Sequence, residues 1–218
     1  MVTLSDTDLI KQSTLIKQFK QAFFTHNLRH VSMNPDSGRL DVRANRVMLL
    51  HKGEIPVPLG KIQGDFTCEA CELTSLQNAP EEVTGSFWCH KNKLQSLQGG
   101  PHTVNGNYFC GWNQLSDLQG APTTFTGLFV AIQPDPGLQS VQGFPPHARH
   151  ITISWHTQLP LLRLIEYSGN LEITEQRNHE RMYHLMDVLE RYRGKGKTHM
   201  LNLALDLKQA GYGGNARW

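Results

Sequence analysis

Apolar residues recur every 21 positions through the middle of the chain. A glycine opens each repeating unit, an aromatic residue and a cysteine follow two positions apart, and two leucines come later. The columns are Gly64, Gly85, Gly106 and Gly127; Phe66, Phe87, Tyr108 and Phe129; Cys68, Cys89 and Cys110; Leu73, Leu94 and Leu115; and Leu76, Leu97 and Leu118. Because so many columns keep one spacing, the sequence predicts a stack of structural repeats.

Each unit is expected to contribute one short strand. Its aromatic residue and its cysteine, such as Phe87 and Cys89, alternate with other positions, which places both on one face of a strand. The unit closes on Leu-Gln-Gly-Ala-Pro, where glycine and proline indicate a turn. One unit alone buries too little apolar surface, so the units predict a parallel sheet whose core holds the aromatic, cysteine and leucine columns.

Less regular units extend the stack at both ends. The fourth unit carries an insertion of two residues around residues 134–137, a weaker fifth begins near Arg149, and a degenerate unit is expected over residues 40–57. Terminal units of a stack are expected to be atypical because one of their faces has no neighbour. The fourth and fifth units lack both cysteine and asparagine, so the ladder of these side chains is predicted to end or distort there.

Near both ends of the chain, apolar residues recur at the spacing of one face of an α-helix. An apolar stripe predicts a helix over about residues 6–25, with Ser5 as its cap, covering the first edge of the sheet. Two more stripes, over residues 182–192 and 200–210, predict a hairpin that is either a cap on the stack or a separate small effector domain. The expected organisation is a helical cap at 1–39, a solenoid at 40–170, and a C-terminal helical hairpin and tail at 171–218.

The repeat is similar to a known one. Phe87-x-Cys89-x-x-Asn92-x-Leu94 resembles the strand signature of leucine-rich repeats. With its Gly-x-Phe-x-Cys start and Ala-Pro ending, it closely resembles the short repeats found in many proteins of tailed bacteriophages and some bacteria. The resemblance covers roughly residues 40–165, and the tail over residues 192–218 is similar to the ends of such phage proteins.

This resemblance implies an α+β solenoid, a short leucine-rich-repeat-like stack of parallel strands. It also implies a binding platform and no catalytic activity. If it extends to origin, the chain is phage-encoded and acts in the host cytoplasm, where it binds and inhibits a host protein, such as a component of antiviral defence.

Composition narrows the class of protein. Of the 218 residues, 39% are hydrophobic and 18% are charged, which excludes a disordered tail. No uncharged apolar run approaches the roughly 18 residues of a membrane helix, and the N-terminal segment lacks the features of a signal peptide. Four cysteines do not make a disulfide scaffold. We therefore expect a soluble, cytoplasmic protein with no membrane partner.

Charge is distributed unevenly. Residues 1–50 carry 7 Lys and Arg against 4 Asp and Glu, residues 51–175 carry 6 against 11, and residues 176–218 carry 8 against 4. A surface for nucleic acid would lie at the two ends, whereas the middle would suit a basic partner. Alternatively, these charges only keep the surface soluble.

The outward columns of the strands are the most informative surface. They read Thr67, Trp88, Phe109 and Val130; Glu69, His90, Gly111 and Ile132; and Asp65, Ser86, Asn107 and Leu128, with Trp112 beside them. In a horseshoe these columns form the concave face, where repeat proteins bind. Exposed large aromatic residues indicate a partner, unless the helices or the C-terminal hairpin fold back over them.

The predicted site follows from these columns. The expected partner-binding residues are Trp88, Phe109, Trp112, Val130, His90, Glu69 and Glu72. An acidic rim of Glu69, Glu72, Glu81 and Glu82 would steer a basic partner, or one with an apolar knob.

Two other functions stay open. A nucleic-acid-associated protein would use the C-terminal cations Arg177, Arg181, Arg191, Arg193, Lys195 and Lys197. Four of these, Arg191, Arg193, Lys195 and Lys197, could also hold a small anion, although a solvated turn is the simpler interpretation. An enzyme would have its site between the solenoid and the hairpin, but no nucleophile, base and orienting group are placed together by the sequence.

Motifs for metals and nucleotides are incomplete. Cys68-x-x-Cys71 has the spacing of zinc ligands, but a buried cysteine column favours core packing over metal or redox chemistry. His179 and His184 are five positions apart, one more than the zinc-binding helix requires, and Gly196-Lys197-Thr198 lacks the earlier glycine of a P-loop because Arg191 stands there. We expect no metal and no cofactor.

Overall fold

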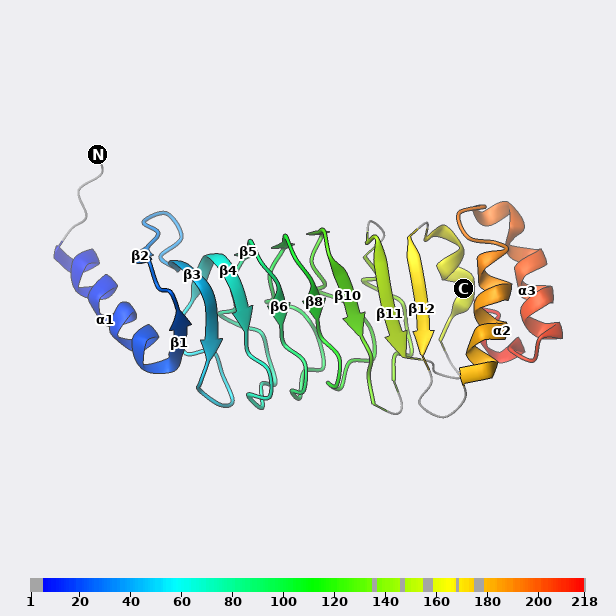
Figure 1. Ribbon diagram of the computed structural model, residues 1–218, viewed down its shortest axis with the longest axis horizontal. Coiled ribbons are helices and arrows are strands. Elements are labelled where there is room, and N and C mark those ends of the chain that lie inside the picture. Colours follow the sequence, from blue (N-terminus) through cyan, green and yellow to red (C-terminus); the bar gives the residue numbers. More distant parts are fainter. Residues whose placement is uncertain are drawn as a thin grey trace.

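The 21-residue columns become neighbouring strands of one sheet. The computed structural model describes residues 6–134, 137–145, 148–154, 159–167, 169–174 and 179–217. Seven strands follow one another along the stack in the order β3-β4-β6-β8-β10-β11-β12, all parallel (Figure 1). They are β3 (Leu40–Leu49), β4 (Leu59–Thr67), β6 (Phe87–Trp88), β8 (Tyr108–Phe109), β10 (Leu128–Ala131), β11 (His150–Ser154) and β12 (Asn170–Thr174). The predicted parallel-strand solenoid is therefore confirmed, with about six turns.

A second line of short strands starts from the first half of β4. It consists of β5 (Glu82–Val83), β7 (Thr103–Val104) and β9 (Thr124–Phe125), which are again parallel. In each regular unit these two residues precede the glycine column, so the chain runs through two short strands per turn. Glycine is required between them because a Cβ on Gly106 would lie 2.7 Å from the carbonyl oxygen of Gly85 in the preceding unit.

Aromatic rings stack through the core along the axis of the solenoid. The centroids of Phe66 and Phe87 are 5.6 Å apart, and those of Phe87 and Tyr108, and of Tyr108 and Phe129, are each 5.2 Å apart. All four rings are fully buried, as are the Cys68, Cys89 and Cys110 side chains. Burial of these columns against their neighbours holds successive units together, since one unit has no core of its own.

Asparagine side chains form a second ladder inside the turns. Asn92 Nδ2 donates to the carbonyl oxygens of Cys68 (2.8 Å) and Cys89 (2.9 Å), and its Oδ1 accepts from the backbone N–H groups of Cys71 (2.9 Å) and Leu73 (3.0 Å). Asn113 repeats this role one unit later. The side chain therefore satisfies backbone groups of two units that would otherwise be buried without partners.

Of the two predicted outcomes at the fourth unit, the ladder distorts and does not end. Gln133, one position before the expected asparagine, accepts a hydrogen bond from Asn113 N (2.9 Å) and donates to Cys110 O (3.0 Å). Its own N–H donates to Ser154 Oγ in the fifth unit (3.1 Å). The longer glutamine side chain compensates for the shifted position.

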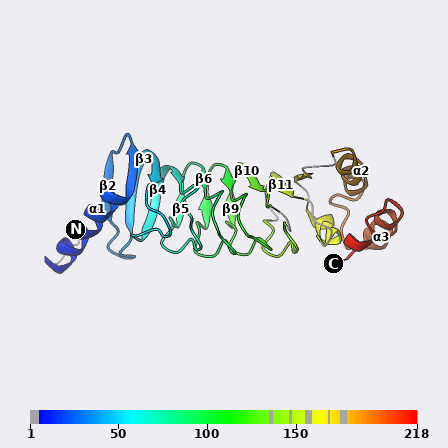
Figure 2. The same cartoon turned by 90° about the horizontal axis from the view of Figure 1, so that it is seen from below.

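The N-terminal segment differs from the predicted all-helical cap. Helix α1 (Asp6–Ala22) ends three residues earlier than expected, and β1 (Phe23–His26) and β2 (His30–Met33) then pair antiparallel with β3. The helix ends because Phe23 turns into the core, where its ring stacks on Phe19 at 4.9 Å. Among the α1 residues only Phe19 and Ala22 are buried, and most of the helix projects from the end of the stack (Figures 1 and 2).

The C-terminal helices close the other end of the stack. They are α2 (His179–Glu190) and α3 (Met200–Gln209), with three short 3-10 helices nearby, Leu161–Glu166, Lys197–His199 and Gly213–Asn215. Leu185 and Leu189 of α2 join the same core as Leu171 of β12, so the hairpin is a cap on the last strand. The predicted boundary at residue 170 cuts through β12, which belongs to the sheet. None of the described helices has the length and hydropathy to cross a lipid bilayer.

Candidate partner-binding surface

Mostly apolar side chains form a row across the outward face of the sheet, in which Thr67 is a polar and buried member. The strand register pairs Phe24 with Met48, Met48 with Thr67, Thr67 with Trp88, Trp88 with Phe109, and Phe109 with Val130. We call these six residues the outer row: Phe24, Met48, Thr67, Trp88, Phe109 and Val130. Phe24 is 54% exposed, and Trp88, Phe109 and Val130 are partly exposed.

The outer row is left open by the helices. In both views α1 lies at one end of the stack and α2 with α3 at the other, and the stack between them is nearly straight (Figures 1 and 2). The alternative that helices fold back over the aromatic residues is therefore wrong for the described residues. The expected concave face is wrong as well, because this side of the stack is close to flat.

Trp88 is held between two neighbours. Its ring stacks on Phe109 with centroids 5.9 Å apart and planes 8° from parallel, and the Arg46 guanidinium lies 5.3 Å from its centroid on the side of β3. Cation–π attraction and stacking fix the indole in place. Because both ring faces are occupied, Trp88 presents its edge outward and has no free face for a flat ligand.

His90 lies beside the stacked rings of Trp88 and Phe109. Its ring meets Phe109 edge-on at 6.4 Å, and its Nε2 lies 2.9 Å from Glu69 Oε1. The buried Nδ1 has no hydrogen-bond partner among the described residues, so in the neutral ring the proton is assigned to Nε2, which donates to Glu69. Lys91 Nζ also reaches Glu69 Oε1 at 2.8 Å, and this hydrogen bond is the main reason that the pKa of Glu69 is lowered.

The expected acidic rim is neutralised by neighbouring cations. Glu72 receives Lys52 Nζ at 2.9 Å and Lys93 Nζ at 3.2 Å, and these hydrogen bonds lower its pKa. The same holds for the other rim carboxylates, in the pairs Glu69 with His90 and Lys91, Glu81 with Arg39 at 3.2 Å, and Glu82 with Lys61 at 2.7 Å. A rim with a cation beside each carboxylate exerts little net attraction on a basic partner.

Trp112 is exposed but stands apart from the outer row. It lies in the turn after β8, where its φ of 53° is left-handed and its N–H donates to Ile132 O at 2.7 Å. Its side chain is 50% exposed, and no ring contact links it to Trp88 or Phe109 in the described structure. The structure therefore joins Trp88, Phe109, Val130 and His90 but leaves Trp112 at the margin.

The C-terminal cations are largely paired within the hairpin. Arg191 bonds Asp206 at 3.1 Å, and Arg193 forms an ion pair with Glu190 and a hydrogen bond to Asn170 Oδ1 at 3.3 Å. Lys195 Nζ lies 5.7 Å from the centroid of the Tyr192 ring. Lys197 begins the 3-10 helix before α3. Arg177 and the side chain of Arg181 lie outside what the structure describes.

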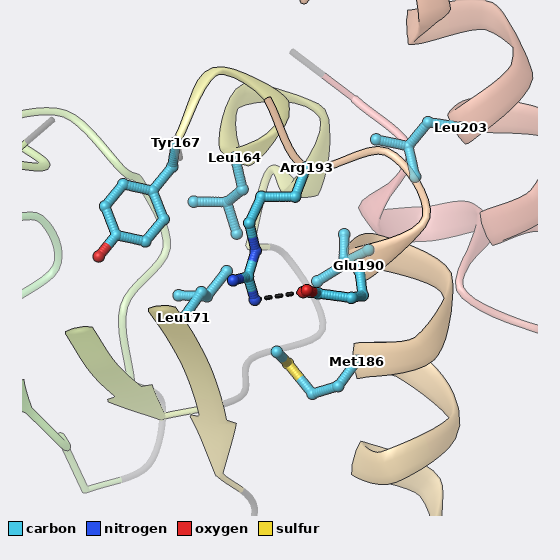
Figure 3. Close-up of a pocket in the computed structure, with 8 residues that line it drawn as sticks. Leu164, Tyr167, Leu171, Met186, Glu190, Arg193 and Leu203 are labelled. Carbon is cyan, nitrogen blue, oxygen red and sulfur yellow. Dashed lines mark ion pairs between the residues drawn. The ribbon is translucent and has the colours of Figure 1, made fainter. Parts of the chain in front are cut away.

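A small cavity lies between the solenoid and the hairpin, where an enzyme site was considered. Figure 3 shows Arg193 passing between Leu164 and Leu171 toward Glu190. The lining is mostly apolar and consists of Leu164, Tyr167, Leu171, Met186, Leu189, Glu190, Arg193 and Leu203. With room for about one water molecule, the cavity is a packing defect under the cap and is too small for a substrate.

The cysteines are embedded in the core. Burial raises the pKa of the Cys68 and Cys110 thiols and raises that of Cys89 to about 12. Cys71 Sγ lies 3.3 Å from Glu69 O and 3.5 Å from Leu49 O. Thiols in this state stay protonated at neutral pH, and the described residues include no cluster of three or more side chains that could ligate a metal.

Sequence reasoning missed the first two members of the outer row and the arginine beside them. Phe24 was assigned to a helix, and Met48 and Arg46 belong to a unit without the glycine, aromatic and cysteine signature. The sequence carries no signal for Phe24, because Phe23 and Phe24 are both phenylalanine and only the structure shows that one is buried and the other exposed. A scan against protein-family models and searches of the curated proteins and of the solved structures find no match to this chain.

Proposed function

We propose that this chain is a non-enzymatic platform for binding another protein, and that the outer row is its contact surface. The supporting observation is the row itself, which places apolar side chains of β1, β3, β6, β8 and β10 on a face that none of the described helices covers. Exposed contiguous apolar surface on a rigid sheet is the usual sign of a protein partner. Trp88 and Phe109 are the expected hot spots, since buried aromatic residues carry much of the energy of interfaces.

The partner is a protein and not a flat ligand such as a sugar ring. Both faces of Trp88 are already covered, by Arg46 and by Phe109, so the ring edges form ridges between which side chains of a partner fit. The rigid sheet keeps the ordering cost of binding low. On the resemblance to phage repeat proteins, we extend the proposal to a host protein that is inhibited by being bound.

Capture of the partner tests the proposal. Tagged protein is incubated with lysate of a bacterium that tailed phages infect, and captured proteins are quantified by mass spectrometry. The variant Trp88→Ala with Phe109→Ala is expected to lower capture of a specific protein at least about 30-fold, the effect of one hot spot of about 2 kcal/mol.

A control variant separates contact from folding. Tyr183 and Leu201 are 74% and 72% exposed on the hairpin, so Tyr183→Ala with Leu201→Ala removes a similar apolar area elsewhere. This control should keep full capture, and both variants should keep the circular dichroism and thermal midpoint of the parent. Unchanged capture by the folded Trp88 and Phe109 variant would refute the proposed surface.

A further inference from the structure

Three arginines and two histidines gather at the first strands of the outward face, and the arginines supply its positive charge. In the register of β1, β2 and β3, His26 faces Arg46 and His30 faces Arg43, and the N–H of Arg29 donates to Arg43 O at 2.8 Å. All five side chains are exposed. We call them the cationic patch: His26, Arg29, His30, Arg43 and Arg46.

The patch is not neutralised in the way the acidic rim is. No carboxylate of the described residues forms an ion pair with Arg29 or Arg43. The carboxylates of Asp41 and Asp65 lie on the same face as the cationic patch, and both already have hydrogen-bond partners. Asp41 accepts from Lys61 N (2.7 Å) and from Asn34 (3.3 Å), and Asp65 accepts from Ser86 N (2.9 Å) and lies 3.7 Å from Arg46.

The cationic patch continues into the outer row. Phe24 and His26 both point outward from β1, and Arg46 and Met48 do so from β3. The Arg46 guanidinium also lies over Trp88, so charge and apolar surface meet at one residue. A partner that covers this end of the row must bring apolar side chains and negative charge together.

We propose that the partner docks through an acidic and apolar segment, whose carboxylates lie on the cationic patch and whose apolar side chains lie on the outer row. This inference rests on the proposed function and replaces the basic partner expected from the sequence. Charge complementarity supports it, because Arg29 and Arg43 have no carboxylate partner among the described residues, whereas each rim glutamate already has a cation beside it.

Nucleic acid fits this surface less well than an acidic protein segment does. A base would need a free aromatic face, and both faces of Trp88 are covered. Beyond Arg46 the outer row continues over Trp88, Phe109 and Val130, side chains that offer a phosphate backbone no positive charge.

Peptide binding tests the assignment directly. The probes are a fluorescein-labelled peptide of about twelve residues in which glutamate alternates with leucine, the matching lysine and leucine peptide, and an oligothymidine of similar length. In fluorescence anisotropy at about 50 mM salt, the acidic peptide should bind, the basic peptide should not, and rising salt should weaken binding.

Charge reversal identifies the residues. Arg29→Glu with Arg43→Glu should lower affinity for the acidic peptide at least about tenfold, and Trp88→Ala should also lower it. The control Lys17→Glu with Lys208→Glu makes the same change in net charge at exposed sites in α1 and α3 and should have little effect. No binding of the acidic peptide, or equal loss in the control, would overturn the inference, and tighter binding of oligothymidine that the arginine variant abolishes would assign the patch to nucleic acid.

The same variants separate this inference from the proposed function. If the folded Trp88 and Phe109 variant loses the lysate partner while the arginine variant keeps it, the platform stands and the acidic docking fails. If neither variant affects capture or peptide binding, both proposals fail.

Discussion

Tyr108 brings a hydroxyl into a core column that otherwise consists of Phe66, Phe87 and Phe129. The hydroxyl is buried beside the Cys89 thiol, a weak hydrogen-bonding group, and no nitrogen or oxygen atom of the described residues bonds to it. Space for it comes from Gly100, whose added Cβ would lie 3.4 Å from the hydroxyl oxygen. A buried hydroxyl with no partner stronger than a thiol costs free energy, and removal of that one group should recover it.

Replacing Tyr108 by phenylalanine should therefore stabilise the protein. We expect Tyr108→Phe to raise the free energy of unfolding by about 1 kcal/mol, measured by urea denaturation. The reverse change one unit earlier, Phe87→Tyr, would bury the same hydroxyl against Ala79, which stands where Gly100 stands in the next unit, and should destabilise. A less stable Tyr108→Phe variant would show that the hydroxyl has a favourable partner.

Glu69 gives the stability a dependence on pH. Its pKa is lowered, chiefly by the hydrogen bond from Lys91, so its charged form stabilises the folded state above the pKa of the unfolded chain, and this contribution is lost as the pH falls through the lowered value. Because the pair is partly exposed, the effect is about 1 kcal/mol or less. Glu69→Gln should lower the thermal midpoint at pH 7 and have almost no effect near pH 2. An equal loss at both pH values would contradict this.

At the scale of the element, the fold depends on positions where one unit approaches the next. The Asn92 ladder and the glycine column both act between units, not within a strand. The sequence predicted the strands because Phe87 and Cys89 repeat in neighbouring units. It could not predict β1, since an antiparallel pair with β3 occurs once and has no repeat, nor Gln133, since its amide reaches the asparagine position from one residue earlier.

Removing a ladder amide should cost more than an ordinary hydrogen bond. Asn92→Ala leaves the N–H groups of Cys71 and Leu73 and two carbonyl oxygens without that partner, and we expect a loss of about 3 kcal/mol in unfolding free energy. Gln133→Ala should also lose about 2 kcal/mol if it truly continues the ladder. The exposed Asn45→Ala is the control, and a loss for Gln133→Ala as small as that of this control would confine the ladder to the asparagines.

Gly106 tests the close approach of neighbouring units. A methyl group there would lie 2.7 Å from backbone atoms of Gly85, which cannot move away without disturbing the sheet. Gly106→Ala should lower stability by about 2–3 kcal/mol. Gly213→Ala, where the nearest atom lies 3.5 Å away, should be close to neutral. Thermal unfolding of both variants decides the matter, and equal midpoints would contradict the packing argument.

At the scale of the whole molecule, the solenoid is a linear array in which each unit contacts only its neighbours. Such an array needs covered ends, because a terminal strand otherwise offers unpaired backbone groups and apolar side chains. Here α2 covers β12, while β1 and β2 close the opposite end beside β3. The helical stripes of the sequence predicted a cap at each end. They did not predict that α1 would bury only Phe19 and Ala22, near its C-terminal end.

Deleting the C-terminal cap should cause self-association. Without residues 179–217, Leu171 and Ile173 of β12 lose their cover, and we expect oligomers in size-exclusion chromatography with light scattering. Deleting residues 1–12 removes the exposed start of α1, none of whose described side chains is buried, and should leave the state of association of the full chain unchanged. A capless chain that kept the same state would mean that β12 needs no cover.

The matched register of Phe66, Phe87, Tyr108 and Phe129 also bears on how such a chain evolves. A 21-residue segment duplicated or lost between two glycines of the column changes the length of the sheet by one strand spacing, about 4.8 Å. Every side chain beyond the junction keeps its orientation, and each cap still packs on the same terminal strand as before. The length of the outward face can therefore change in discrete steps by recombination within the gene, without any new substitution.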